Sequence, residues 1–338
     1  MWVCIIRFIY TKYIVTMKNI LVTGGCGFIG SNVINYLVTK YRNINIFNID
    51  RLDYCASLDN ITVSNCKNYR FFKGDINSHD LVNHILNEYN IDTVIHFAAQ
   101  SHVSSSFGNS LQFTKDNVLG THSLLECCRV FGNITRFIHI STDEVFGEIK
   151  LDDPACLENA LLQPTNPYAC SKAAAEFMVK SYWYSYKLPI IIVRMNNVLG
   201  PRQYPEKLIP KFIMLLLNNK KCTIEGIGNN RRNFIHVDDV SSALDIILFK
   251  AELGETYNIG TNNEYSVNEI TQKLINILKP GELLENNIEY IQDRNFNDFR
   301  YSVNSDKIKK LGWKEKVNFD DGLLRTVEWY KNKFQIVQ

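Results

Sequence analysis

Residues 19–30 read NILVTGGCGFIG, an apolar run that leads into a glycine-rich segment. The glycines Gly24, Gly27 and Gly30 recur at every third position, and a helical pattern follows over 31–41. Glycine allows a tight turn and close approach of a pyrophosphate, while a helix start offers free N–H groups and the positive end of its dipole. The glycine spacing alone is a weak signal, because turn glycines are common. Between a strand pattern and a helix pattern, it predicts a strand–turn–helix unit that binds phosphate.

The same rhythm continues toward the C-terminus. Short apolar runs lie at 44–49, 69–72, 93–97, 136–141 and 189–193, and stretches with helical periodicity separate them. Strands that are covered on both faces read as short apolar runs, and helical crossovers between them make neighbouring strands parallel. The sequence therefore predicts an α/β fold built on a doubly wound parallel sheet.

A second, smaller domain is predicted after Gly200 and Pro201, where the rhythm changes. We predict a first domain over 17–198 and a C-terminal substrate-binding domain over 199–331. Segment 255–259 reads as one more apolar strand. Two places stay open for it, the second domain or the edge of the first sheet.

Residues 1–16 are apolar but contain Arg7 and Lys12, whereas a membrane-spanning helix needs about 20 mostly uncharged residues. The segment also lacks the order of features that marks a signal peptide. Because Met17 opens the first strand pattern, we expect residues 1–16 to be a dispensable extension.

The charge balance and the cysteines bear on partners and compartment. A net charge of +2, from 37 basic and 35 acidic residues, favours a small ligand over nucleic acid. The nine cysteines are odd in number and form no C-x-x-C pair, which argues against a disulfide framework and a structural zinc site. We expect a cytoplasmic protein with no metal and no membrane partner.

Asp50 stands twenty residues beyond Gly30, at the end of the second strand pattern. A carboxylate there can accept hydrogen bonds from an adenosine ribose and repels a 2′-phosphate, which favours NAD over NADP. Arg51 follows directly and is the counter-argument, since a cation would attract that phosphate. Asp75 closes the next strand pattern and is expected near the adenine, with a helix N-cap as a compatible second role.

Tyr168 and Lys172 are four residues apart and share one face if the segment is helical. An ammonium nearby would lower the pKa of the tyrosine from about 10 and make it a usable general base. The pair alone is common in helices. In order after the glycine turn, Asp50 and a strand ending in Ser141 and Thr142, it is hard to obtain by chance.

From residue 18 to 331 the chain resembles the extended short-chain dehydrogenase/reductase superfamily, and within it the nucleotide-sugar 4,6-dehydratases. Further motifs that carry the resemblance are HFAAQSHV (96–103), STDEV (141–145), PEKLIP (205–210), YNIG (257–260) and LGW (311–313). The eukaryotic-type branch, with its dTDP-glucose and UDP-glucose dehydratases, is nearest through LDYC (52–55), SFGNS (106–110) and DRNFND (293–298). The resemblance implies a Rossmann domain that binds NAD.

The resemblance also implies a chemical role for each residue of the site. Tyr168, with Lys172, would take the proton of the glucose C4 hydroxyl, and Thr142 would hydrogen-bond the C4 oxygen. Glu144 would then remove the C5 hydrogen while Asp143 protonates the departing C6 hydroxyl. Two crowded carboxyls do not ionise together readily, so one can be the acid and the other the base.

The binding residues that the resemblance implies fall into two groups. The NAD site would comprise Gly24, Gly27, Phe28, Ile29, Gly30, Asp50, Asp75, Ile76, Ala98, Ala99, Ser101, Tyr168 and Lys172. The sugar-nucleotide site would comprise Ser101, Thr142, Asn197, Lys207, Leu208, Arg232, Arg294 and Asn297.

The predicted function is dehydration of dTDP-glucose or UDP-glucose to the 4-keto-6-deoxy sugar nucleotide, toward a deoxysugar such as rhamnose, in a homodimer. Asn297 and Val267 depart from the bacterial pattern near the nucleotide, so the choice between thymine and uracil stays open. A UDP-sugar 4-epimerase is the alternative within the superfamily, and a non-catalytic NAD-binding scaffold is the alternative outside enzymes. Asp143 and Glu144 argue against both, since neither needs an acid and a base for C5 and C6.

Overall fold

The computed structural model describes residues 17–335, and the predicted extension 1–16 lies outside them. Within the described residues, seven parallel strands form the central sheet in the order β10-β6-β5-β4-β1-β2-β3. This is the predicted doubly wound fold, because the strand order reverses between β1 and β4. The strands are β1 (Asn19–Thr23), β2 (Asn45–Asp50), β3 (Tyr69–Lys73), β4 (Thr93–His96), β5 (Arg136–Thr142), β6 (Ile190–Met195) and β10 (Thr256–Ile259).

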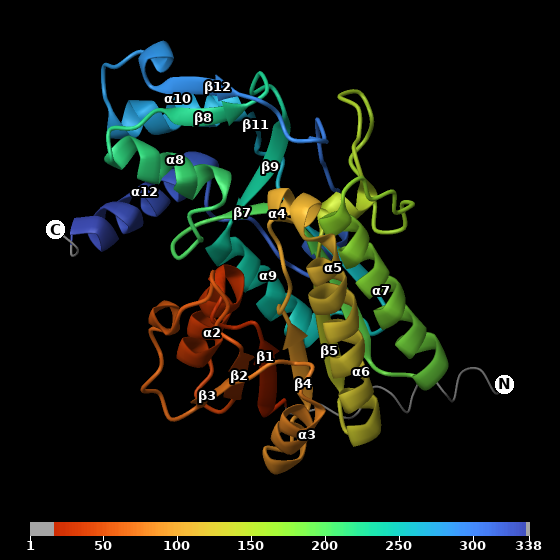
Figure 1. Ribbon diagram of the computed structural model, residues 1–338. Helices are drawn as coiled ribbons and strands as arrows, with labels where there is room; N and C mark the ends of the chain where they lie inside the picture. The colour runs from red at the N-terminus through yellow and green to blue at the C-terminus, as the bar shows by residue number, and fades with distance from the viewer. Residues whose placement is uncertain (1–16, 336–338) are drawn as a thin grey trace.

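Helices cover both faces of this sheet (Figure 1). One layer holds α2 (Phe28–Lys40) and α9 (Val237–Lys250), which pack against each other. The opposite layer holds α3 (His79–Glu88), α6 (Gly120–Phe131) and α7 (Pro167–Tyr186). Successive strand residues point to opposite faces, so Ile20 and Val22 join the core beneath α2 while Leu21 joins the core beneath α3. Burial on both faces explains the continuous apolar runs of the sequence.

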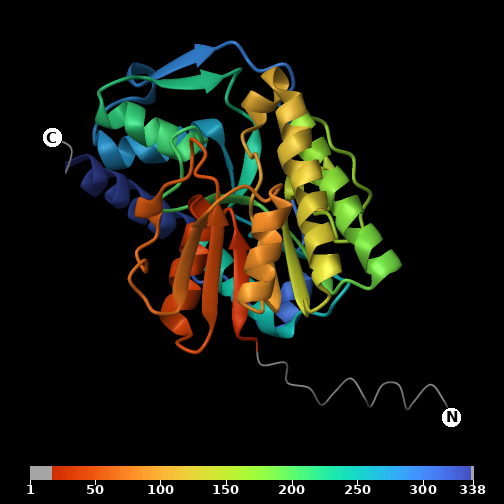
Figure 2. The same ribbon diagram turned by 60° about the horizontal axis from the view of Figure 1, so that its bottom comes forward.

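A smaller C-terminal part lies beyond the carboxyl ends of the strands (Figures 1 and 2). It contains the sheet β7-β9-β11, the pair β8-β12 and a separate apolar core. The remaining elements are α4 (Val103–Gly108), α5 (Ser110–Phe113), β7 (Asn197–Leu199), α8 (Leu208–Leu217), β8 (Cys222–Glu225), β9 (Arg231–His236), β11 (Glu264–Ser266), α10 (Val267–Leu278), β12 (Ile288–Ile291), α11 (Asp306–Lys310) and α12 (Phe319–Gln335). Within residues 17–335, every helix is too short or too polar to cross a membrane.

The boundary between the two parts is not a single point in the chain. The strand predicted at 255–259 forms β10 and pairs with β6 at the edge of the central sheet. Helix α9, which precedes it, packs on α2. The range 199–331 predicted for the second domain therefore includes a return of 237–259 to the first, because the edge strand β6 offers unpaired backbone groups that β10 satisfies.

Candidate active site

A cleft runs along the carboxyl ends of the central strands, with the C-terminal part as its other wall. Its floor takes residues from the ends of β1 to β6, and its far wall includes Asn197, Lys207 and Leu208. Ligands of doubly wound sheets bind at this edge, near the reversal of strand order. All the residues predicted to contact NAD line this cleft.

The glycine turn is packed too closely to hold side chains at Gly24 and Gly30. Gly24 has φ +68°, and a Cβ there would lie 2.6 Å from the backbone nitrogen of Ala98. A Cβ on Gly30 would lie 2.6 Å from the carbonyl oxygen of Gly24. Gly27 faces the cleft and is the N-cap of α2, so the first N–H groups of that helix meet no capping side chain. This cradle fits a pyrophosphate.

Asp50 is oriented by backbone groups at the end of β2. Its Oδ2 accepts from the backbone N–H of Cys26 at 2.9 Å, and its Oδ1 accepts from that of Leu52 at 2.8 Å. Each carboxylate oxygen keeps further lone pairs for a ligand. The carboxylate lines the cleft, where it can receive the hydroxyls of a ribose.

Arg51 is neutralised by carboxylates rather than free for a phosphate. Its guanidinium lies 2.7 Å from Asp53, 2.7 Å from Asp116 and 3.2 Å from Asp75. Gln100 also donates to Asp53 at 3.0 Å and to Asp116 at 2.9 Å. The excess of negative charge around one cation disfavours a 2′-phosphate at this end of the cleft. Arg51 therefore does not favour NADP here, because Asp53 and the sequence-distant Asp75 and Asp116 pair with it.

Tyr168 and Lys172 lie on the first turns of α7, which starts at Pro167. The side chain of Asn166 caps this helix by accepting from the backbone N–H of Ala169 at 2.9 Å. Both side chains of the predicted pair reach the cleft from one helix face. The four-residue spacing is therefore realised as a shared face.

Burial dominates the electrostatics of this pair. Burial raises the pKa of Tyr168, and the Glu144 carboxylate adds to the rise. Lys172 donates instead to the carbonyl oxygen of Ile140 at 2.6 Å, and burial lowers the pKa of its ammonium to about 8. Burial therefore sets the direction of the tyrosine pKa in this arrangement, and its lowering by Lys172 stays a prediction.

Thr142, Asp143 and Glu144 stand where β5 ends, so the alternation of a strand no longer separates their side chains. Thr142 and Glu144 line the cleft, whereas Asp143 lies behind them and is 2% exposed. Burial raises the pKa of Asp143 to about 7, and burial also raises the pKa of Glu144. Nearby Lys207 and Arg232 oppose the rise at Glu144. The two carboxyls can therefore hold different protonation states near neutral pH.

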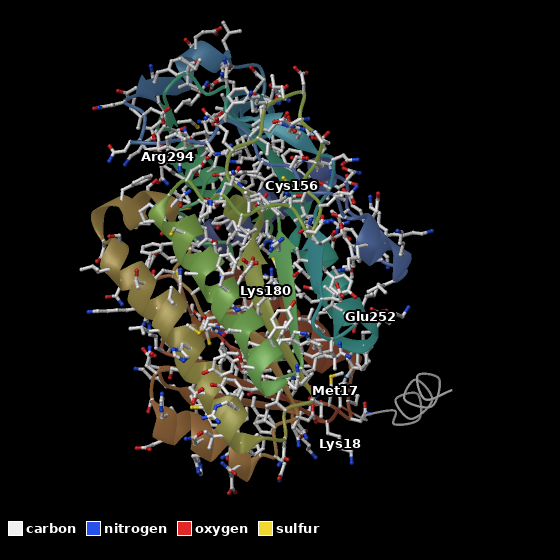
Figure 3. All side chains as sticks on the ribbon, turned by 90° about the vertical axis from the view of Figure 1, so that its right-hand side faces the viewer. Met17, Lys18, Cys156, Lys180, Glu252 and Arg294 are labelled. Atoms are coloured by element: carbon white, nitrogen blue, oxygen red, sulfur yellow. The ribbon has the colours of Figure 1, made fainter. Side chains whose placement is uncertain are left out.

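The predicted substrate residues separate into two groups. Ser101, Thr142, Asn197, Lys207 and Leu208 line the cleft, and Lys207 donates to the carbonyl oxygen of Ser101 at 2.5 Å. Arg232, Arg294 and Asn297 lie outside the cleft lining, on β9 and the segment after β12. Arg232 lies 3.5 Å from Asn297 Oδ1. Arg294, labelled in Figure 3, pairs with Glu225 at 3.4 Å.

Sequence reasoning missed Asn196, which lines the cleft beside Asn197 and donates to Asp143 Oδ2 at 2.8 Å. It also missed Asp116, whose partner Arg51 lies 65 positions away. Neither residue belongs to a local pattern that marks it. Glu206 and Tyr204, which also line the cleft, lie in or beside the quoted segment 205–210 and could have been found there.

The family model for GDP-mannose 4,6 dehydratase matches residues 21–326. The chain belongs to this family. The dTDP-D-glucose 4,6-dehydratase of Mus musculus is 50% identical over 321 residues, which cover 94% of this chain and 90% of that protein. The predicted resemblance to nucleotide-sugar 4,6-dehydratases is thereby confirmed.

A plant protein and a solved bacterial structure are also similar to this chain. The trifunctional protein RHM2 of Arabidopsis thaliana, named UDP-glucose 4,6-dehydratase, 3,5-epimerase and reductase, is 49% identical over 317 residues. The match covers 93% of this chain but 47% of that protein, so the chain spans about half its length. The crystal structure of the dTDP-glucose 4,6-dehydratase DesIV from Streptomyces venezuelae, with NAD and a second ligand, superposes with a TM-score of 0.89 at 37% identity. That superposition covers 94% of this chain and 98% of DesIV.

Proposed function

We propose that this protein is an NAD-dependent nucleoside-diphosphate-glucose 4,6-dehydratase, which forms the 4-keto-6-deoxyglucose nucleotide and water from dTDP-glucose or UDP-glucose. The observation that carries the proposal is the meeting of Tyr168 and Thr142 with the carboxyls of Glu144 and Asp143 at one end of the cleft. Relatives at 49–50% identity bear the names of such dehydratases.

NAD fits the other end of the cleft. The glycine cradle would take its pyrophosphate, and Asp50 would take the ribose hydroxyls. When bound, NAD would supply an acceptor for the C4 hydride and a source of that hydride for C6, and a proton would return to C5 at the same stage.

The side chains divide the remaining chemistry. Thr142 donates a hydrogen bond to the C4 oxygen, and Tyr168 takes the proton of the C4 hydroxyl. The 4-ketone that forms acidifies the C5 hydrogen, which Glu144 removes. Asp143, whose pKa near 7 lets it carry a proton, protonates the C6 hydroxyl so that it departs as water.

The test is incubation of the purified protein with dTDP-glucose and UDP-glucose in separate reactions, followed by mass spectrometry. The expected result is loss of one water from either sugar nucleotide, with no net consumption of cofactor. The substrate that loses water shows whether the enzyme prefers thymine or uracil. Unchanged mass with appearance of the galactose epimer would replace the proposal with a 4-epimerase. If neither sugar nucleotide reacts, the result would favour a non-catalytic NAD-binding scaffold.

Cofactor choice gives a first prediction. Replacing Asp53 and Asp116 together with asparagine should free Arg51 for a 2′-phosphate and raise the affinity for NADP relative to NAD by about 10-fold or more. Isothermal titration of both nucleotides measures it. Asp80→Asn, a change at an exposed carboxylate on α3, is the control and should leave the ratio unchanged. If the double variant kept the native ratio of NADP to NAD affinity, Asp53 and Asp116 would not be what disfavours NADP.

We also propose a homodimer formed through α6, α7 and the preceding α5, which share one side of the molecule (Figure 3). Large apolar side chains stand exposed on this side: Leu111, Val130, Phe177, Tyr184 and Tyr186. Such a gathering is typical of a protein interface. The predicted cytoplasmic location stays a prediction.

The dimer predicts the effect of a charge on α7. Phe177→Glu should convert the dimer to a monomer in size-exclusion chromatography with light scattering, because an unpaired charge would be buried at the contact. Leu283→Glu is the matched control, since Leu283 is similarly exposed on the C-terminal part. A wild-type monomer, or a dimer that survives Phe177→Glu, would overturn this arrangement.

A further inference from the structure

Asn196 is a buried amide that connects the acid Asp143 to the C-terminal part of the chain. It follows β6 directly, is 3% exposed and lines the cleft. Its Nδ2 donates to Asp143 Oδ2 at 2.8 Å, and its Oδ1 accepts from the backbone N–H of Thr261 at 3.2 Å. A backbone N–H can only donate, so this contact fixes which end of the amide faces Asp143.

The surroundings hold Asn196 in this orientation. A Cβ at Gly260 would lie 2.0 Å from Asn196 Oδ1, so a glycine at that position makes room for the amide. Thr261 is itself held, because its hydroxyl donates to the carbonyl oxygen of Phe234 at 2.7 Å. Asn233 donates to the carbonyl oxygen of Thr261 at 2.9 Å. The amide is therefore a rigid donor rather than an adaptable one.

The rigid donor makes the two oxygens of Asp143 unequal. Oδ2 faces an N–H donor that cannot accept, so a proton on the carboxyl is favoured on Oδ1 over Oδ2. Oδ1 accepts from the hydroxyl of Thr142, which lines the cleft, at 3.2 Å. A hydroxyl can rotate and accept instead, so a proton on Oδ1 faces no fixed donor. The oxygen favoured for the proton is thus the one in contact with a residue that lines the cleft.

We propose that Asn196 is a positioning residue that places the proton of Asp143 on Oδ1 and so aims it at the C6 hydroxyl that leaves as water. This inference rests on the dehydratase function proposed above. In that step Glu144 takes the C5 proton, the C5–H electron pair forms the C5–C6 double bond, and the C6–O bond breaks as the C6 hydroxyl takes the proton of Asp143 and leaves as water. Asn196 itself gains and loses no proton.

The first test is Asn196→Ala, with Asn233→Ala as the matched control that touches Thr261 but not Asp143. In the Asn196 variant, water loss should fall by about 10-fold to 100-fold, since a misplaced acid costs rate steeply. Formation of the reduced cofactor in a single turnover should stay within about twofold. The alkaline limb of the pH profile for water loss should move to higher pH, because removal of a donor to the carboxylate raises the pKa of Asp143. The control should leave that limb in place.

A second measurement separates this inference from the proposed function. Carbon-13 NMR of the carboxyl of Asp143, assigned with Asp143→Asn, follows its titration with or without activity. We expect the titration midpoint of Asp143 to rise in Asn196→Ala and to rise further in Asn196→Asp. Aspartate has the shape of asparagine, so the second variant serves if Asn196→Ala does not fold. An unmoved midpoint, or equal losses of cofactor reduction and water loss, would overturn the role of Asn196. Absence of water loss in the wild type would overturn the dehydratase instead.

Discussion

Tyr168→Phe should reduce cofactor reduction and water loss together by about 10³-fold, because both depend on removal of the C4 hydroxyl proton. The side chain is buried and lines the cleft, and phenylalanine keeps its shape while removing the hydroxyl. Nucleotide-sugar binding should change little, since the loss falls on the transition state. Single-turnover absorbance of the reduced cofactor measures the first step, and mass spectrometry measures the second.

The matched control for this prediction is Tyr184→Phe, which removes a hydroxyl from the same helix at a side chain that is 71% exposed. It should leave both rates unchanged. Burial and Glu144 keep Tyr168 protonated in the structure, so the tyrosine needs positive charge near it before it can accept a proton. A Tyr168→Phe enzyme within 10-fold of the wild type would remove Tyr168 from the chemistry.

Asp143→Asn should slow water loss by about 10²-fold or more while cofactor reduction continues, because the amide cannot supply the proton to the C6 hydroxyl. Asparagine keeps an acceptor, its Oδ1, toward the Asn196 amide. Its Nδ2 would donate to the hydroxyl of Thr142, which donates to Asp143 in the native protein and can rotate to accept. The reduced cofactor should therefore accumulate in a single turnover. Equal slowing of both steps would contradict the assignment of Asp143 as the acid.

The same substitution should stabilise the fold above neutral pH. The pKa of Asp143 rises from an ordinary 3.8 to about 7 in the folded state, so its stabilising contribution is full below pH 3.8 and is lost as pH rises through about 7. This corresponds to a cost of roughly 4 kcal/mol at pH 8, which asparagine does not bear. Chemical denaturation at pH 8 should show the gain, and at pH 4 the two proteins should differ little. Asp152→Asn, at an exposed carboxylate, is the control, and no gain at pH 8 would contradict the burial of a charge at Asp143.

The two effects together describe a trade between stability and activity at one carboxyl. Asp143 is held where its ionised form is costly, and that cost keeps a proton available near neutral pH. The pair of asparagines beside the carboxyls, Asn196 at Asp143 and Asn166 at Glu144, supplies N–H donors in place of water. Burial of Asp143 therefore both excludes solvent and raises the pKa of its carboxyl.

Much of the fold and site could be predicted because it depends on patterns that are local in the chain. The apolar run before Gly24 forms β1 (Asn19–Thr23), since consecutive side chains must be apolar in a strand buried on both faces. Gly24 and Gly30 make the cradle for the same steric reason that drew attention to them. Tyr168 and Lys172 share a face because four residues make about one helical turn. Asp50 is the last residue of β2 and lines the cleft, because the carboxyl ends of the parallel strands form the cleft floor.

Only the tertiary structure decided which distant residues meet. Arg51 is neutralised by Asp116, and Asp143 contacts Asn196, in each case across many residues of sequence. The burial of Asp143 behind the cleft also depends on how the chain packs. Such contacts depend on how helices and strands pack, and no period in the sequence encodes them. The sign of the pKa shift at Tyr168 was also beyond the sequence, because spacing supplies the neighbour while burial, a property of the whole fold, determines which effect wins.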